Sequence, residues 1–241
     1  MLPDVVYVVK VGATNEQLRY SLRSLKNIPH RRVFIAGYVP PWVTGVVPVP
    51  VEQTAQKHAN ALNNLRAALE HPDLGESFLY MNDDFFAMRP IPEVPPLHRG
   101  PVSGVEAKFA SAGFGLYLTG LRQAQAVLAT LGYADPLCYE LHVPFPAEKS
   151  LYRDVLELTG DQPHLHHRTV YGNLHHRRAG RMSDVKVYRR DAGFREQGVF
   201  LSTMSDSFTH GRVGAFIRAR FPEPGRYEDP AVPSGAARAA H

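Results

Sequence analysis

The segment Ser77-Phe78-Leu79-Tyr80-Met81-Asn82-Asp83-Asp84-Phe85-Phe86 is the most informative stretch of the chain. Its apolar first half is typical of a buried strand, and the strand ends abruptly in one amide and two carboxylates. In an open α/β sheet, ligands bind just beyond the carboxyl ends of the strands. Adjacent carboxylates repel each other unless a positive charge lies between them. We therefore expect Asp83 and Asp84 to hold Mg²⁺ or Mn²⁺ against substrate phosphates, with a solvated Asp-Asp turn as the alternative.

The residues on the N-terminal side of this strand alternate between strand and helix patterns. Strands are expected over residues 5–11, 32–38, 46–51 and 78–81, and helices over residues 15–25 and 55–70. Leu18, Leu22 and Leu25 share one apolar helix face, and Asn15 stands where a helix cap belongs. This order predicts an α/β fold in which a Rossmann-type sheet is flanked by helices.

The second half of the chain has a less regular pattern. Helices are expected near residues 118–131, 147–158 and 209–221, and strands near residues 184–188 and 199–201. One domain over residues 1–228 fits the length of 241 residues. The Pro/Ala/Gly-rich residues 229–241 are expected to form a disordered tail.

The composition predicts a soluble globular protein that favours anionic partners. Hydrophobic residues make up 44% and charged residues 21%, with a net charge of +4. This charge favours nucleotides, phosphates or DNA as partners. The one cysteine, Cys138, looks like a core residue, and no apolar run approaches the ~18 residues that span a bilayer. We expect a cytoplasmic protein with no membrane partner, and the oligomeric state stays open.

Several catalytic signatures are missing from the sequence. It has no G-x-G-x-x-G fingerprint, Walker A loop, nucleophile elbow, C-x-x-C pair or H-E-x-x-H segment. Dinucleotide redox chemistry, P-loop phosphoryl transfer and serine hydrolysis are therefore disfavoured.

Other polar residues are candidates for a binding site. Arg19 and Arg23 share a helix face and could reach a phosphate, the alternative being a solvated basic face. Glu140 and His142 would lie on the same face of a strand. His142 has a side chain suited to removing a proton from a hydroxyl, the alternative being a structural histidine.

The later segments add two further groups. Histidines cluster at residues 164–167 and 175–176, where zinc is one interpretation, although the spacing is not that of a finger. Between them, Arg168, Tyr171 and Asn173 offer donors for a sugar or phosphate, or form a loop that hydrogen-bonds itself. Asp206 follows the strand near residues 199–201 and would either complete the acidic site or cap a helix.

Three segments of the chain resemble the second conserved region of the Stealth family. They are Leu18-Arg19-Tyr20-Ser21-Leu22-Arg23-Ser24, Val39-Pro40-Pro41-Trp42 and Phe78-Leu79-Tyr80-Met81-Asn82-Asp83-Asp84-Phe85-Phe86. Residues 4–7 and 142–146 resemble the first and third regions, and residues 200–206 weakly resemble the fourth. Members of this family transfer hexose-1-phosphate from nucleotide sugars. The chain also resembles the compact Stealth-like proteins of actinobacterial phages, which are usually labelled glycosyltransferases.

The resemblance implies a GT-A-like fold for nucleotide sugars, with metal–diphosphate binding at Asp83 and Asp84. It implies a reactive role for His142 and phosphate or sugar contacts from Arg19 and Arg23. The chain departs from the family where Val9 and Val11 replace a usual Trp and Asp, with Gly12 retained. It is also much shorter than the Stealth members that act in capsule synthesis, which argues against a polysaccharide acceptor.

We therefore expect a metal-dependent, nucleotide-sugar-dependent glycosyltransferase, in the host cytoplasm if a phage encodes it. His142 and Asp84 are the catalytic candidates, and Asp83 and Asp84 the metal ligands. The donor-binding candidates are Arg19, Arg23, Asn82, Arg168, Tyr171, Asn173 and Asp206. A hydroxymethylated pyrimidine in phage DNA is a candidate for the acceptor. The alternatives are hexose-1-phosphate transfer to a glycan or protein, and a non-catalytic module that binds DNA or phosphate.

Overall fold

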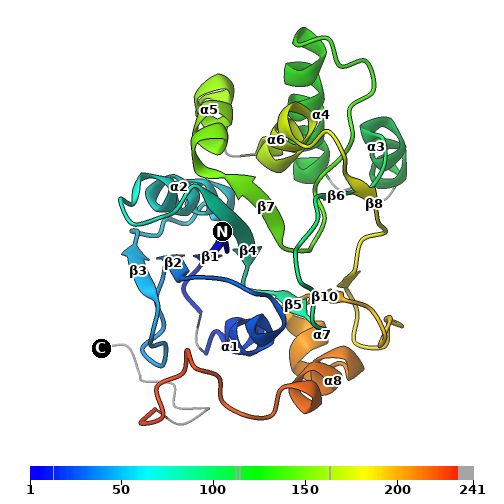
Figure 1. Ribbon diagram of the computed structural model, residues 1–241. Coiled ribbons are helices and arrows are strands. Elements are labelled where there is room, and N and C mark those ends of the chain that lie inside the picture. The colour runs from blue at the N-terminus through cyan, green and yellow to red at the C-terminus, as the bar shows by residue number, and fades with distance from the viewer. Residues whose placement is uncertain (13, 112, 114, 163, 233–241) are drawn as a thin grey trace. The chain divides into compact units, whose positions relative to one another are not determined.

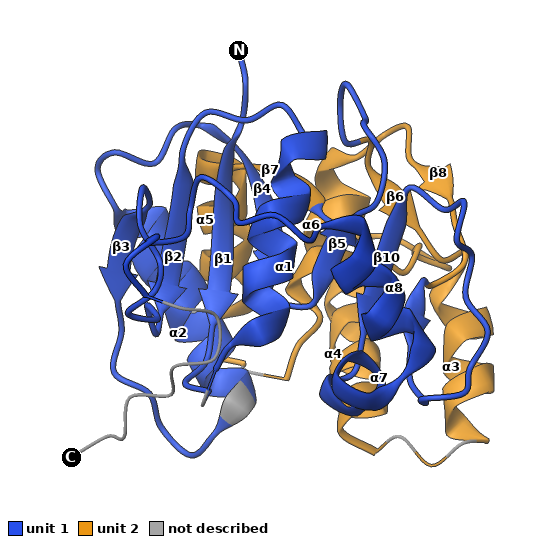
Figure 2. Ribbon diagram, turned by 90° about the horizontal axis from the view of Figure 1, so that it is seen from below, with its two compact units in different colours: residues 1–94, 142–144, 185–241 blue, residues 95–141, 145–184 orange. Residues whose placement is uncertain are grey.

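The computed structural model describes residues 1–12, 14–111, 113, 115–162 and 164–232 (Figure 1). It divides into two compact units (Figure 2). Unit 1 contains residues 1–94, 142–144 and 185–241, and unit 2 contains residues 95–141 and 145–184. The expected single domain over residues 1–228 stays a prediction, and residues 233–241 of the expected tail lie outside the described residues.

Four parallel strands of unit 1 form a sheet in the order β3-β2-β1-β4. Their bounds are β1 (Asp4–Val9), β2 (Val33–Gly37), β3 (Val47–Pro50) and β4 (Ser77–Asn82). The helices between them are α1 (Glu16–Ser24), a short 3₁₀ helix η1 (Leu25–Asn27) and α2 (Lys57–Glu70). In Figure 1, α1 and α2 lie on opposite faces of this sheet. The predicted α/β sheet flanked by helices is confirmed, and its strand order is compatible with a Rossmann-like fold.

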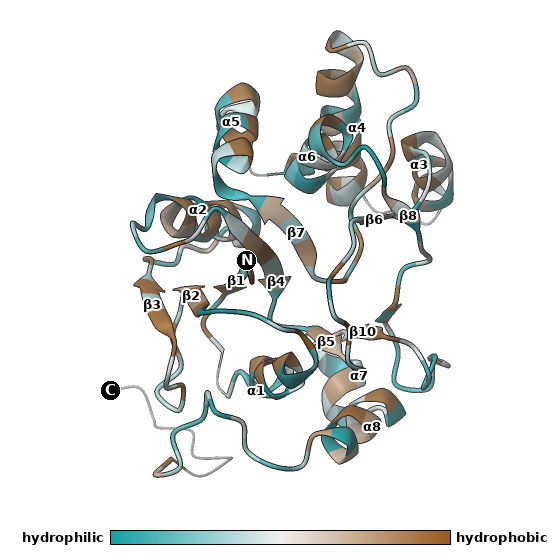
Figure 3. Ribbon diagram, viewed as in Figure 1, coloured by the Kyte–Doolittle hydropathy of each residue, from teal (hydrophilic) through white to brown (hydrophobic). Residues whose placement is uncertain are grey.

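The apolar runs of the sequence explain why these strands form. Val5, Val6, Phe34 and Ile35 have no exposed surface or almost none, and the strands are coloured mainly toward the hydrophobic end of the scale in Figure 3. A parallel sheet that is covered on both faces requires continuous apolar runs rather than alternation. The sequence pattern therefore placed these strands correctly.

A second, smaller sheet in unit 1 has the order β5-β10-β9. Its strands are β5 (Phe85–Ala87), β9 (Lys186–Val187) and β10 (Phe200–Thr203). β5 begins directly after the Asp83–Asp84 turn and pairs antiparallel with β10. The ring of Phe86 stacks on the ring of Phe208, with centroids 5.8 Å apart, so this sheet packs on the helices that follow it.

The expected helix over residues 209–221 is two helices, α7 (Ser205–His210) and α8 (Arg212–Arg220). Gly211 separates them in an extended conformation. A Cβ atom at Gly211 would lie 2.4 Å from the carbonyl oxygen of Ser207. The single-helix prediction was wrong because the chain turns tightly at this glycine.

Unit 2 contains four helices and three short strands within the described residues. They are β6 (Leu97–His98), α3 (Val102–Ala110), α4 (Gly115–Thr130), β7 (Phe145–Glu148), α5 (Lys149–Thr159), α6 (His167–His175) and β8 (Gly180–Arg181). β6 and β8 pair in parallel. Cys138 is fully buried in a cluster with Val102, Val105 and Leu121, which confirms that its side chain belongs to a core.

Three local predictions were wrong in unit 2 and at the start of α1. Residues 168–173 form most of α6 rather than a loop, and Gly172 faces the Tyr139 ring so closely that a Cβ would lie 2.4 Å from it. Residues 140–143 do not form a strand. Asn15 precedes α1, but its side chain donates to the carbonyl oxygen of Lys10 instead of capping the helix.

In the part of the chain that the structure describes, no helix is both long and apolar enough to cross a membrane.

Candidate functional site

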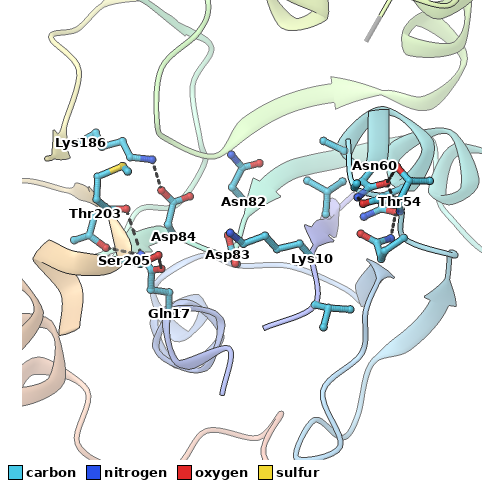
Figure 4. Close-up of a pocket in the computed structure, with 17 residues that line it drawn as sticks. Lys10, Gln17, Thr54, Asn60, Asn82, Asp83, Asp84, Lys186, Thr203 and Ser205 are labelled. Carbon is cyan, nitrogen blue, oxygen red and sulfur yellow. Dashed lines mark hydrogen bonds and ion pairs between the residues drawn. The ribbon is translucent and has the colours of Figure 1, made fainter. Parts of the chain in front are cut away.

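A cavity of about 440 Å³ opens at the carboxyl ends of β1 and β4 in unit 1 (Figure 4). β1 has β2 on one side and β4 on the other, so the connections leave in opposite directions at this point. Such switch points are where open α/β sheets bind ligands. The cavity is lined by Val8, Lys10, Val11, Gln17, Gln53, Thr54, Ala55, Asn60, Ala61, Asn64, Asn82, Asp83, Asp84, Lys186, Thr203, Met204 and Ser205.

One side of the cavity is formed by Asn82, Asp83 and Asp84. The two carboxylates lie at a strand end, where the sequence predicted them. Asp84 is buried, whereas Asp83 is half-buried. Burial and the adjacent Asp84 carboxylate raise the pKa of Asp83 to about 6, although Lys10 and Lys186 act in the opposite direction. Two close carboxylates in a partly dry site gain from a bound positive charge, because the charge relieves their repulsion.

Two lysines stand beside these carboxylates. The Nζ atom of Lys186, on β9, donates to Asp84 Oδ2 at 2.7 Å, and Ser202 Oγ donates to the same oxygen at 3.0 Å. Lys10 follows β1 and its side chain extends toward Asp83 (Figure 4). The cavity therefore presents carboxylates and ammonium groups together, a combination that suits a phosphate accompanied by a cation.

The opposite wall of the cavity consists of amides and a hydroxyl from the β3–α2 connection and α2. Asn60 Oδ1 accepts hydrogen bonds from the backbone N–H and the hydroxyl of Thr54, both at 2.8 Å. Gln53 Nε2 donates to Asn64 Oδ1 at 3.0 Å. These bonds fix the orientation of the amides, so the wall is a preformed polar surface rather than a set of mobile side chains.

Asn64 reaches this wall because β2 ends in a glycine. Gly37 has a φ of +104°, and a Cβ atom there would lie 2.3 Å from Asn64 Nδ2. That nitrogen donates to the carbonyl oxygen of Val9 at 3.3 Å. Only glycine combines this backbone conformation with such close approach.

Two serines of α1 hold the strand that follows the acidic turn. Ser21 Oγ donates to the carbonyl oxygen of Phe85, and Tyr7 Oη lies 2.8 Å from the same hydroxyl. Ser24 Oγ accepts from the backbone N–H of Ala87 at 3.1 Å. Because β5 begins one residue after Asp84, these bonds set the position of the carboxylates.

Arg19 and Arg23 form a buried ion-pair cluster with Glu228, which lies 205 residues beyond Arg23. Arg19 Nη1 donates to Glu228 Oε2 at 2.7 Å, and Arg23 Nε donates to Oε1 at 2.6 Å. Both arginines are 6% exposed, so the solvated basic face weighed as an alternative is wrong. They are not among the lining residues of the cavity, and their proposed contact with a donor phosphate stays a prediction.

Glu228 is held ionised by these partners. Burial alone would raise its pKa, but hydrogen bonds from Arg23, the Gly225 backbone and Arg19 hold the pKa below its usual range. The guanidinium of Arg19 also lies 4.2 Å from the Trp42 ring centroid. The arginines and serines of the L-R-Y-S-L-R-S segment thus all have partners within the chain.

His142 belongs to unit 1 and lies beside the strand that follows the acidic turn. Its ring meets the edges of Phe85 and Tyr188, with centroids 6.1 Å and 6.5 Å away. It is half-buried and does not line the cavity. Glu140 belongs to unit 2 instead, so the two residues do not share the strand face that their spacing predicted.

The three donor candidates on α6 have partners inside unit 2. Arg168 Nη2 donates to Glu140 Oε2 at 2.8 Å, and Tyr171 stacks on Tyr152. Asn173 Nδ2 donates to the carbonyl oxygen of Leu137 at 2.7 Å. These contacts explain the three residues as supports of unit 2, and their role toward a donor stays a prediction.

Asp206 lies in the first turn of α7 and forms an exposed ion pair with Arg190 at 2.6 Å. The helix start is instead bonded by Ser207, whose hydroxyl accepts from the backbone N–H of Met204 at 3.0 Å. Ser205, the residue before Asp206, lines the cavity, whereas Asp206 does not. Asp206 therefore neither completes the acidic cluster nor occupies the cap position.

The donor set at Asn82–Asp84 fits a hard divalent cation, because two carboxylates and an amide oxygen follow one strand. Among the residues described, no group of three or more histidine, cysteine, aspartate or glutamate side chains is gathered to hold a metal. A cation at Asp83 and Asp84 would need further oxygen ligands from outside these residue types, such as phosphate oxygens.

Sequence reasoning missed both lysines and the amide wall. Lys10 could have been found, because it directly follows the first predicted strand and parallel strands end at the same edge of a sheet. Lys186 lies 102 residues from Asp84, and no local pattern connects the two. Asn60 and Asn64 are spaced by four residues on the predicted helix, a signal that marks a shared face.

Comparison with protein-family models finds no matching family, and comparison with curated proteins finds no similar sequence.

Proposed function

We propose that the chain is a nucleotide-sugar-dependent glycosyltransferase with a GT-A-like fold, and that the cavity at the end of β4 binds the donor. The observation that carries the proposal is the cavity's composition: Asp83 and Asp84 stand beside Lys10 and Lys186, facing a fixed amide wall. A nucleotide sugar has an anionic diphosphate between two polar groups, and this cavity offers charges and amides for both kinds of group. The resemblance to the compact Stealth-like phage proteins, which are usually labelled glycosyltransferases, supports glycosyl transfer, whereas the resemblance to other Stealth members supports the alternative of hexose-1-phosphate transfer.

Each lining group has a task in this proposal. Asp83 and Asp84, with Asn82, would hold Mg²⁺ or Mn²⁺, which neutralises charge that develops on the leaving diphosphate. Lys10 and Lys186 bind phosphate oxygens electrostatically. The amides of the Gln53–Asn64 wall bind the hydroxyls or base of the nucleotide.

The proposed reaction is the attack of an acceptor hydroxyl on the donor sugar. Its oxygen attacks the anomeric carbon, the bond from that carbon to the diphosphate oxygen breaks, and the nucleoside diphosphate leaves with the electron pair. His142 lies outside the residues that line the cavity but contacts Phe85, directly after the acidic turn, and in this proposal it accepts the hydroxyl proton. The net charge of +4 favours DNA as the acceptor, for example through a hydroxymethylated pyrimidine.

The test is to identify the nucleotide released. The protein is incubated with UDP- and GDP-sugars, with Mn²⁺ or EDTA, and with or without hydroxymethylated DNA, and products are identified by mass spectrometry. Metal-dependent release of nucleoside diphosphate is expected. Release of nucleoside monophosphate would assign hexose-1-phosphate transfer instead. If no nucleotide is released from any donor, and DNA binding is salt-sensitive but unaffected by EDTA, the protein is a non-catalytic binding module.

His142→Ala tests the assignment of the base. Loss of a general base costs about 10²–10⁴-fold in rate, so turnover is expected to fall within that range while donor binding is retained. Tyr188→Phe is the matched control, because it keeps the ring that His142 contacts. Full activity in His142→Ala would show that the histidine is structural.

A further inference from the structure

A second cavity, of about 480 Å³, lies elsewhere in unit 1, between η1 with the residues after it and the segment over residues 221–227. Its volume is in the range of sites that enclose small molecules. None of its lining residues lines the donor cavity. The proposed glycosyl transfer therefore gives it no task.

The cavity has an apolar wall. Leu22, Leu25, Ile28 and Phe221 line it, and each is at most 3% exposed. Such side chains offer no hydrogen bonds, so this wall suits a hydrocarbon or aromatic group.

The remaining lining residues carry positive charge that is incompletely balanced. Lys26 and Arg226 are both exposed. In the described chain, neither has an aspartate or glutamate oxygen within ion-pair distance. Arg23 also lines the cavity, but its guanidinium is paired with Glu228, a carboxylate that it shares with Arg19. Glu223 is the one carboxylate among the lining residues.

Arg226 is oriented by neutral partners. Its Nη2 atom donates to Tyr227 Oη and to His30 Nε2, each at 2.6 Å. His30 Nδ1 lies 2.6 Å from the carbonyl oxygen of Ile28, so it carries the proton and leaves Nε2 as an acceptor. Burial, and then Arg226, lowers the pKa of His30 against the effect of the Ile28 bond. The guanidinium is thus fixed in place without its charge being cancelled.

We propose that this cavity binds a small organic anion, a phosphate or carboxylate joined to an apolar or aromatic group. Arg226 and Lys26 bind the anionic end, since a guanidinium matches the paired oxygens of such groups. Leu25, Ile28 and Phe221 contact the apolar end. Tyr227 and His30 position Arg226.

Calorimetric titration with phenyl phosphate tests this site, with inorganic phosphate and benzyl alcohol as partial probes. Phenyl phosphate is expected to bind about tenfold or more tightly than inorganic phosphate, because the ring adds apolar burial. Phenylacetate, titrated in parallel, is expected to bind as well, which distinguishes a general anion site from a phosphate-specific one. Equal affinity for phenyl phosphate and inorganic phosphate, or saturable binding of benzyl alcohol at the same strength, would overturn the proposal.

Two variants locate the binding. Arg226→Gln is expected to weaken phenyl phosphate about 10- to 100-fold, the value of a charge-assisted hydrogen bond, and Arg226→Lys by less. Lys186→Gln, in the donor cavity, is the matched control and should leave the affinity unchanged. Unchanged affinity in Arg226→Gln would overturn the proposal, and a loss confined to Lys186→Gln would place the anion in the donor cavity instead. Nucleotide release in Arg226→Gln reports on the donor site separately, so the two proposals fail independently.

Discussion

The acidic turn after β4 and the arginine face of α1 each place two like charges close together in unit 1, and the surroundings of the two pairs differ. Asp83 and Asp84 have like charges side by side and line a cavity. Arg19 and Arg23 also have like charges, but Glu228 lies between them and all three side chains are buried. Buried charges persist in a core when a partner of opposite charge is supplied.

The difference separates a candidate site from a structural support. In the arginine cluster every charged side chain has partners within the chain: Glu228 bonds both guanidiniums, Arg23 also donates to the carbonyl oxygen of Phe221, and Arg19 lies over the Trp42 ring. The acidic turn is balanced only in part, since Lys186 pairs with Asp84 while the pKa of Asp83 stays raised. A charged group whose pKa stays perturbed in the folded protein is a better indicator of function than one whose partners the chain supplies.

Among the predictions, Asp83→Asn has the largest expected effect, a loss of nucleotide release, and it tests the difference between the acidic turn and the arginine cluster directly. The substitution removes a carboxylate repelled by Asp84, so the free energy of unfolding should stay the same or rise. Losses of about 10–100-fold are usual for groups one step removed from a metal, so nucleotide release should fall by more than this. Steady-state kinetics and urea denaturation measure the two quantities. A variant that keeps its turnover but unfolds easily would reverse the interpretation of the turn.

Glu228→Ala is expected to lower the free energy of unfolding and to change donor affinity little, which is the opposite of the effect of Asp83→Asn. Removing one partner of a buried ion pair costs about 3–5 kcal/mol, and here two guanidiniums lose their shared carboxylate. Urea denaturation measures the loss, and donor affinity of the remaining folded protein should change little. Asp206→Ala breaks the exposed Arg190 pair as a control and should leave the midpoint unchanged. If both variants had equal midpoints, Glu228 would not be the support described above.

The Arg168–Glu140 pair extends the comparison to unit 2 and predicts a pH dependence. Burial acts to raise the pKa of Glu140, but Arg168 and the nearby histidines lower it from 4.5 to about 2. The folded value lies below the unfolded one, so the ionised group stabilises the protein above about pH 4.5.

That stabilisation is lost as the pH falls from 4.5 toward 2, and it is on the order of 3 kcal/mol. Urea denaturation of the wild type and of Glu140→Gln between pH 5.5 and 2.5 measures it. The stability difference between the two proteins should shrink as the pH falls. A difference that is constant across this range would mean that Glu140 does not titrate with a lowered pKa.

Much of unit 1 could be predicted because its signals are local. The β-branched run at residues 5–9 and the apolar run that stops at Asn82 give strands, and Leu18 and Leu22 give the buried face of α1. The acidic turn was predicted to lie at a strand end and lines the cavity there. These patterns depend on hydrophobic periodicity over fewer than about 15 residues, which the chain shows without reference to its fold.

Unit 2 was harder to predict because contacts override local preference there. Gly172 and the histidines around it look like a loop, yet α6 forms because Gly172 admits the Tyr139 ring and Tyr171 packs on Tyr152. The alternation of polar and apolar residues around His142 predicted a strand, but no strand forms there, and Glu140 accepts a hydrogen bond from Arg168 on α6. These ion pairs and ring contacts join residues between 19 and 33 positions apart, outside any local period.

The sequence by itself determined the strands and helices of the sheet and the place of two carboxylates after one of its strands. The tertiary structure decided which charges are paired. Glu228 reaches Arg23 across 205 residues, and Lys186 reaches Asp84 across 102. The physical reason is that periodicity is a property of neighbouring residues, whereas the partner of a charge depends on which distant side chain the folded chain brings within about 3 Å.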